Sequence, residues 1–162
     1  MLGFTLNRNY TRVKLTDEMR AAKVTQKELD MLNKLAHHVF VEVFGLVPKW
    51  DVHIQLFEED EYEHTHGVNP HSTAFANWPD HYHTGVVGIK APILKEGSDE
   101  VLSVLIHEAI HLTMASLTDL LNEATPKRLY SDVNNADEEF VSEMTSIFYQ
   151  QLRLSGIDKL LA

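Results

Sequence analysis

Hydrophobic and polar residues follow two different periods along the chain, and the longer period predicts its first helix. Over residues 25–44, apolar side chains recur at spacings of three and four, which is typical of an amphipathic helix. Thr25 and Glu28 have the spacing of a capping box, in which each side chain bonds the other residue's backbone amide. Gly45 and Pro48 end the pattern.

Strands are predicted where the period shortens to two. Residues 50–57 alternate between apolar and polar side chains, which indicates a strand with one buried face. Shorter runs at residues 72–78 and 85–89 predict two further strands. Turn-forming and acidic residues separate these runs, so we expect a small sheet.

Two more helices are predicted in the second half of the chain. Residues 98–121 are apolar nearly all round, which is typical of a buried central helix, with Ser98 as its N-cap. Residues 122–134 are rich in polar residues and are expected to form a loop. Residues 136–154 predict the last helix. Its expected core stripe is Phe140, Met144, Ile147, Phe148 and Leu152.

Composition and charge narrow the class of protein. The order of elements and the length of 162 residues predict one α+β domain, residues 1–162, with residues 1–24 as an arm of unknown role. A net charge of −10 argues against binding to nucleic acid or to an anionic membrane surface. No signal peptide or transmembrane segment is visible, so we expect a cytoplasmic protein. The chain has no cysteine but ten histidines, so metal ligands must be His, Asp or Glu.

The clearest chemical motif lies on the predicted central helix. His107 and His111 stand four positions apart and therefore share one helix face, with Glu108 beside them. In this spacing two imidazoles can bind one Zn²⁺ per chain, and the glutamate can act as general base toward a zinc-bound water. Two histidines on a buried helix also need polar partners, which a metal would supply.

A zinc site of this kind needs a third protein ligand, and the last helix offers acidic candidates. Glu139 and Glu143 share one flank of that helix, where one can bind zinc and the other can accept the free N–H of a ligand histidine. Glu138 lies on the opposite flank and is the alternative ligand. Asp137 and Glu138 are otherwise explained by favourable charge near a helix N-terminus.

These motifs resemble the zincin metallopeptidases, in particular the glutamate-ligand branch that includes thermolysin. The resemblance implies a minimal zincin-like fold: a small mixed sheet, a central helix with the His-Glu-x-x-His motif, and a C-terminal helix that carries an acidic ligand. It implies His107, His111 and Glu139 as zinc ligands, Glu108 as base and Glu143 as the supporting acid. Glu143 stands where that branch has aspartate, and the long spacing between the two motifs is more similar to small stand-alone zincins of bacteria and phages.

The resemblance also implies a peptide-binding strand and an oxyanion donor. Residues 72–78 resemble the edge strand that binds extended peptide, which points to Ala74, Phe75, Ala76 and Asn77. Candidates for transition-state stabilisation are His83, Tyr130 and Tyr149, together with the segment His81–Tyr82. His64, His66, His71, His81 and His83 form a histidine-rich stretch that is either a second metal site or a polar loop.

The sequence therefore predicts a zinc-dependent metallopeptidase that acts on a peptide or protein. Because little of the chain lies outside the predicted catalytic core, a partner protein that completes the cleft is expected. Two alternatives stay open: a zinc-containing module that binds peptide or protein without turnover, and a zinc hydrolase of a non-peptide amide. Glu108 favours an enzyme over a binding module, because zinc binding alone needs no acid there.

Overall fold

A computed structural model describes residues 2–58, 72–78 and 83–157 of the chain. It has a four-stranded mixed sheet in the order β1-β2-β4-β3. The central strands β2 (Asp51–Phe57) and β4 (Thr84–Lys90) are parallel, whereas β1 (Gly3–Thr5) and β3 (Ala74–Asn77) pair antiparallel at the two edges. The α+β class and the three predicted strands are confirmed, and the N-terminal arm contributes β1.

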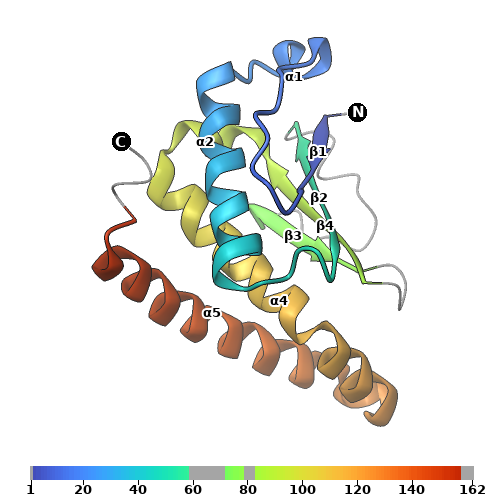
Figure 1. Ribbon diagram of the computed structural model, residues 1–162. Helices are drawn as coiled ribbons and strands as arrows, with labels where there is room; N and C mark the ends of the chain where they lie inside the picture. The colour runs from blue at the N-terminus through green and yellow to red at the C-terminus, as the bar shows by residue number, and fades with distance from the viewer. Residues whose placement is uncertain (1, 59–71, 79–82, 158–162) are drawn as a thin grey trace.

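The helices form two further layers beside the sheet. The helix α1 (Asp17–Ala21) is short, and α2 (Gln26–His37) continues as a π-helical segment, η1 (His38–Val43). The long helices α4 (Ser98–Ala124) and α5 (Tyr130–Ser155) form a hairpin, and Figure 1 shows α5 lying along α4 on the side away from the sheet. Short 3-10 segments η2 (Ala91–Lys95) and η3 (Lys127–Leu129) precede the two long helices.

The core lies between the sheet and the helices α2 and α4. Strand β2 buries alternate residues Val52, Ile54 and Leu56, as its period predicts. The predicted capping box is present: Glu28 N donates to Thr25 Oγ1 at 3.2 Å, and Thr25 N donates to Glu28 Oε2 at 2.7 Å. These contacts fix α2, which helps to hold α4 against the sheet.

By length and hydropathy α4 is apolar enough to cross a membrane, but its place in the fold gives a simpler reason for its composition. Half of its most apolar window is buried inside the protein. Leu102, Leu105 and Ile106 are completely buried in the core. This packing is consistent with a soluble protein, whose core helices have the same composition.

The helical hairpin differs from the prediction at its turn and at its start. The expected loop over residues 122–134 is wrong, because α4 continues to Ala124 and α5 begins at Tyr130. Pro126 confines the break to a few residues, and the polar residues that follow it lie on an exposed helix where they cost little. Ser98 is also not the N-cap of α4; Gly97 holds that position with φ 114°.

The buried face of α5 is also rotated relative to the predicted stripe. Phe140 and Ile147 are 45% and 52% exposed, whereas Val141 and Thr145 are buried. Met144, Phe148 and Leu152 are partly buried against the core, as expected. The buried stripe therefore runs through residues 141, 145, 148 and 152. Glu138 lies about one turn before Val141 on the same face of α5, the face that meets α4.

Candidate metal centre

Two histidine side chains from α4 meet at the surface where α4 faces α5. His107 and His111 lie one turn apart, so their rings project from the same side of the helix. Their Nε2 atoms are 3.1 Å apart, and both side chains are largely buried. The predicted pair is thus arranged so that both nitrogens can reach one ion.

Glu138 of α5 brings a carboxylate to the same point. Its Oε2 lies 3.5 Å from His107 Nε2, and its Oε1 lies 3.4 Å from His111 Nε2. The three ligand atoms lie within 4.8 Å of one another. Of the alternatives that the sequence left open, the structure brings Glu138 to the histidines.

The separation of the two ring nitrogens suits a metal ion. Zinc binds nitrogen ligands at about 2.1 Å, and at that length the two Nε2 atoms, 3.1 Å apart, would subtend about 95° at the ion. Contacts on the side of each ring that faces away from the site indicate which imidazole nitrogen carries the proton.

Thr145 determines the tautomer of His107. Its Oγ1 donates to the Val141 carbonyl at 2.7 Å, so its single proton is already engaged. The same Oγ1 lies 3.4 Å from His107 Nδ1 and can only accept there. His107 therefore carries its proton on Nδ1, and the lone pair of Nε2 faces His111 and Glu138.

Asp137 acts in the same direction on His111. Its Oδ2 lies 3.8 Å from His111 Nδ1, and a carboxylate favours a proton on the nitrogen that it faces. Both Nε2 lone pairs then point at the same position as the Glu138 carboxylate. Three acceptors that converge without a proton among them repel one another, and a cation would remove that repulsion. The donor set thus fits Zn²⁺, which takes neutral imidazole and carboxylate ligands.

Glu108 lies next to these groups and is almost completely buried. Its side chain is 4% exposed, and its Oε2 has no hydrogen-bond partner within the described residues. Burial raises the pKa of Glu108 to about 8; the nearby Glu138 charge adds to this rise, and His107 opposes it. The ionised form of Glu108 is a stronger proton acceptor than an exposed carboxylate, and a cation bound beside it would favour that ionised form.

A cleft of about 870 Å³ opens onto this cluster, and the edge strand β3 forms one of its walls. Figure 1 shows β3 beside α4 at the end of the sheet order. Trp78, which follows β3, donates from Nε1 to Asp119 Oδ1 of α4 at 3.0 Å and so fixes the strand to the helix. The residues that line the cleft are Ser72, Ala74, Phe75, Ala76, Asn77, Trp78, His107, Glu108, His111, Thr118, Asn122, Asn134, Asp137 and Glu138. The four residues proposed for peptide binding, Ala74, Phe75, Ala76 and Asn77, are therefore all at the cleft.

Other residues singled out in the sequence lie elsewhere. Glu139 and Glu143 are exposed on the far side of α5 and do not line the cleft. The reason is the rotated stripe: once Val141 and Thr145 face α4, these two glutamates face solvent. The predicted roles of Glu139 as zinc ligand and of Glu143 as supporting acid need both side chains at the cleft, where the structure places neither.

The three candidates for transition-state stabilisation are also absent from the residues that line the cleft. His83 packs edge-on against Trp50, with ring centroids 5.3 Å apart. Tyr149 lies near Asp99, in the first turn of α4. Burial, and to a smaller extent the charge of Asp99, raises the pKa of Tyr149. Tyr130 is at the first turn of α5. The remaining candidates of that stretch, His64, His66, His71, His81 and Tyr82, are outside the described residues.

Sequence reasoning did not assign Thr145 and Asp137 to the site. In the sequence, favourable charge near a helix N-terminus is enough to explain Asp137. Nothing in the sequence indicates a role for Thr145 at the metal site unless the buried face of α5 is known. A stripe of 141, 145, 148 and 152 has regular spacings of four, three and four, and this was the available signal for both.

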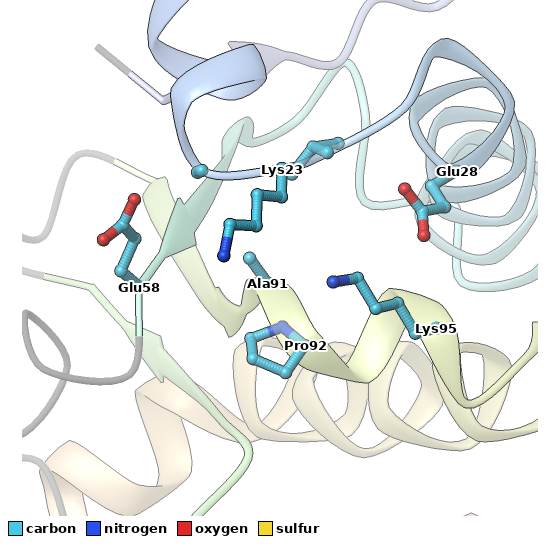
Figure 2. A pocket seen from close by; sticks show the side chains of 8 residues that line it. Lys23, Glu28, Glu58, Ala91, Pro92 and Lys95 are labelled. Atoms are coloured by element: carbon cyan, nitrogen blue, oxygen red, sulfur yellow. The ribbon is translucent and has the colours of Figure 1, made fainter.

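A second, smaller pocket shares no lining residue with the cleft. It has a volume of about 210 Å³ and lies where the chain before α2 approaches η2. Figure 2 shows the ammonium groups of Lys23 and Lys95 inside it, with Glu58 and Glu28 at its sides. Glu28 is bonded to Thr25 of the capping box. Two ammonium groups make this pocket unsuitable for a metal cation.

Comparison of the chain with protein-family models, with curated proteins and with solved structures finds no match. The assignment of function therefore rests on the chemistry of the cleft.

Proposed function

We propose that this protein is a zinc-dependent metallopeptidase with a zincin-like fold. His107, His111 and Glu138 would hold one Zn²⁺ per chain, which when bound would supply a Lewis acid for the scissile carbonyl and for a water molecule. The observation that carries the proposal is the convergence of these three acceptors beside a buried carboxylate, Glu108, that has an unpaired oxygen.

Glu108 has the position and the environment of a general base. It would accept a proton from the attacking water and then deliver it to the leaving amine. Its burial keeps bulk water away from Oε2. Its raised pKa makes the ionised form a stronger acceptor than an exposed carboxylate, and a bound cation would favour that form. The hydrogen bond between His107 and Thr145 and the nearby Asp137 charge at His111 would keep both rings in the orientation that metal binding needs.

The edge strand β3 supports a peptide as the substrate. It pairs with β4 on one side only within the described residues, so its other edge can bond an extended chain. That edge borders the same cleft as Glu108 and the histidines. A partner protein that completes the cleft and a cytoplasmic location remain parts of the same proposal.

Turnover is tested by comparing the wild-type protein with two single variants on a peptide library derived from a whole proteome. Zinc-loaded wild type and Glu139→Gln should cleave the same bonds, because Glu139 lies outside the cleft. Glu108→Gln should retain zinc and lose cleavage by at least about a hundredfold, the usual contribution of a general base. Zinc binding without cleavage in the wild type would favour the binding module, and cleavage of amides other than peptides would favour the third alternative.

A further inference from the structure

Beyond the proposed metal ligands, the cleft continues toward the turn of the helical hairpin, and its lining changes in character. Thr118 and Asn122 of α4 face it from one side, and Asn134 of α5 faces it from the other. We propose that this end of the cleft is a subsite for a polar, uncharged side chain of the substrate, such as Gln, Asn, Ser or Thr. The inference deepens the proposed function and rests on it for the direction of the bound peptide.

The positions of the three residues follow from helix geometry. Thr118 and Asn122 come seven and eleven residues after His111, which returns them to the face that carries the histidines. Asn134 precedes Glu138 by one turn on α5, so it faces the same cleft. Together they extend the face that holds the metal-binding atoms into a wall of hydroxyl and amide groups.

Free hydrogen-bonding capacity is the second observation. Within the described part of the chain, no hydrogen bond engages the side chains of Thr118, Asn122 or Asn134. The nearest acid on this part of α4, Asp119, accepts a hydrogen bond from Trp78 Nε1 at 3.0 Å. The wall therefore offers unpaired donors as well as acceptors, which an amide or hydroxyl side chain can satisfy together.

Charge in the cleft argues against an acidic side chain, and its polar lining argues against an aliphatic one. Among the described residues, no Lys or Arg lines the cleft, whereas Asp137 and Glu138 do. An acidic substrate side chain would thus meet no cation other than the metal. An aliphatic side chain would cover polar groups without bonding them, which lowers affinity.

The distance between the subsite and the histidines determines which residue of the bound peptide contacts the subsite. At about 1.5 Å per residue, Thr118 and Asn122 lie roughly 10 and 16 Å along α4 from His111. An extended peptide advances about 3.3 Å per residue, so the subsite contacts a side chain about three to five positions from the scissile bond. The preference should appear on one side of that bond only.

The test uses labelled decapeptides in which one position at a time is Gln, Leu, Glu or Lys. Their binding to zinc-loaded Glu108→Gln protein is measured by fluorescence anisotropy, and their cleavage by wild type is measured separately. Gln at one position should bind about fivefold to tenfold tighter than Leu or Glu. Thr118→Val together with Asn122→Leu should remove that preference. Thr113→Val, on the exposed face of α4, should keep it.

The outcomes separate the inference from the proposed function. Absence of cleavage by wild type together with a Gln preference in binding would contradict the peptidase alone. Cleavage with equal binding of all four side chains, a preference for Leu, Lys or Glu, or binding of none of the peptides would overturn the polar subsite. A Gln preference that survives in a folded Thr118→Val, Asn122→Leu variant would also overturn it.

Discussion

Replacing Thr145 with valine removes one hydroxyl while nearly preserving the shape of a buried side chain. The hydroxyl donates to the Val141 carbonyl at 2.7 Å and accepts from His107 Nδ1 at 3.4 Å. In the variant, His107 Nδ1 loses its acceptor. The ring is then free to place its proton on Nε2, where it would block metal binding.

The geometry sets the size of the expected effect. A net hydrogen bond contributes about 0.5–1.5 kcal/mol, and a 3.4 Å contact belongs near the middle of that range or below it. A loss of about 1 kcal/mol corresponds to roughly fivefold weaker zinc binding. Groups that orient metal ligands typically change metal affinity by about 10–100-fold, so about fivefold to tenfold is the expectation for Thr145→Val.

Competition with a chromophoric chelator measures the affinity, and long-range ¹H–¹⁵N NMR of the metal-free protein reports the His107 tautomer. Thr145→Ser keeps the hydroxyl and should restore both readouts. Thr113→Val is the matched control: the Thr113 hydroxyl also donates to a carbonyl one turn earlier, Ala109 O at 2.7 Å, but it lies on an exposed face. A folded Thr145→Val protein with wild-type zinc affinity and the wild-type His107 tautomer would show that Thr145 does not orient His107 for metal binding.

Three other changes test the metal, the edge strand and a surface ion pair. Free zinc at about 100 times its Kd should raise the unfolding free energy of wild type by about 2.7 kcal/mol, seen as a higher thermal midpoint; an equal rise in His107→Ala would contradict the assigned site. Gly88→Ala places a Cβ against the Phe75 ring and should cost about 1–3 kcal/mol in urea denaturation; a cost that is undiminished in a Phe75→Ala background would show that the ring is not the obstacle. Hydrogen bonds from Arg12 lower the pKa of Asp30 below 3.8, so their stabilisation is present above that value and is lost as pH falls through the folded pKa. Asp30→Asn should therefore be less stable than wild type by up to about 1 kcal/mol at pH 7, and the difference should vanish in acid; a constant difference down to pH 2 would argue against the pair.

The part of the site on α4 could be predicted because it depends on local spacing alone. Residues four apart on any helix share a face, so His107 and His111 converge wherever that helix packs. The apolar residues before them also predicted a buried helix, and burial is what leaves Glu108 without a partner. The strands were predictable for the same reason, because the alternation of apolar and polar residues shows directly which side chains of a strand are buried.

The part on α5 could not be predicted with the same certainty, because it depends on which face of α5 meets α4. Phe140 and Ile147 are large and apolar, so the sequence pattern predicts them on the buried face of α5, although both are exposed in the structure. Because the buried face is rotated, Glu138 lies at the histidines in the structure, where the sequence predicts Glu139. Asp137, Glu138 and Glu139 are consecutive and present an acid on nearly every face of the helix, so only the packing against α4 distinguishes the candidates.

The turn of the hairpin shows a related limit. Residues 130–135 include Ser131, Asp132, Asn134 and Asn135, whose side chains favour turns in isolation. In the structure they form the first turns of α5, and Asn134 lines the cleft. Later residues of α5 pack into the core, and this tertiary packing outweighs the weak local preference of the exposed first turns.

The proposed metal centre is tested most directly by the zinc stoichiometry and affinity of two variants that differ by one position, Glu138→Gln and Glu139→Gln. We expect one zinc per chain in wild type and in Glu139→Gln with equal affinity, and at least about tenfold weaker binding in Glu138→Gln. Unchanged affinity in Glu138→Gln with a loss in Glu139→Gln, or no zinc bound by folded wild-type protein, would contradict the proposed ligand set.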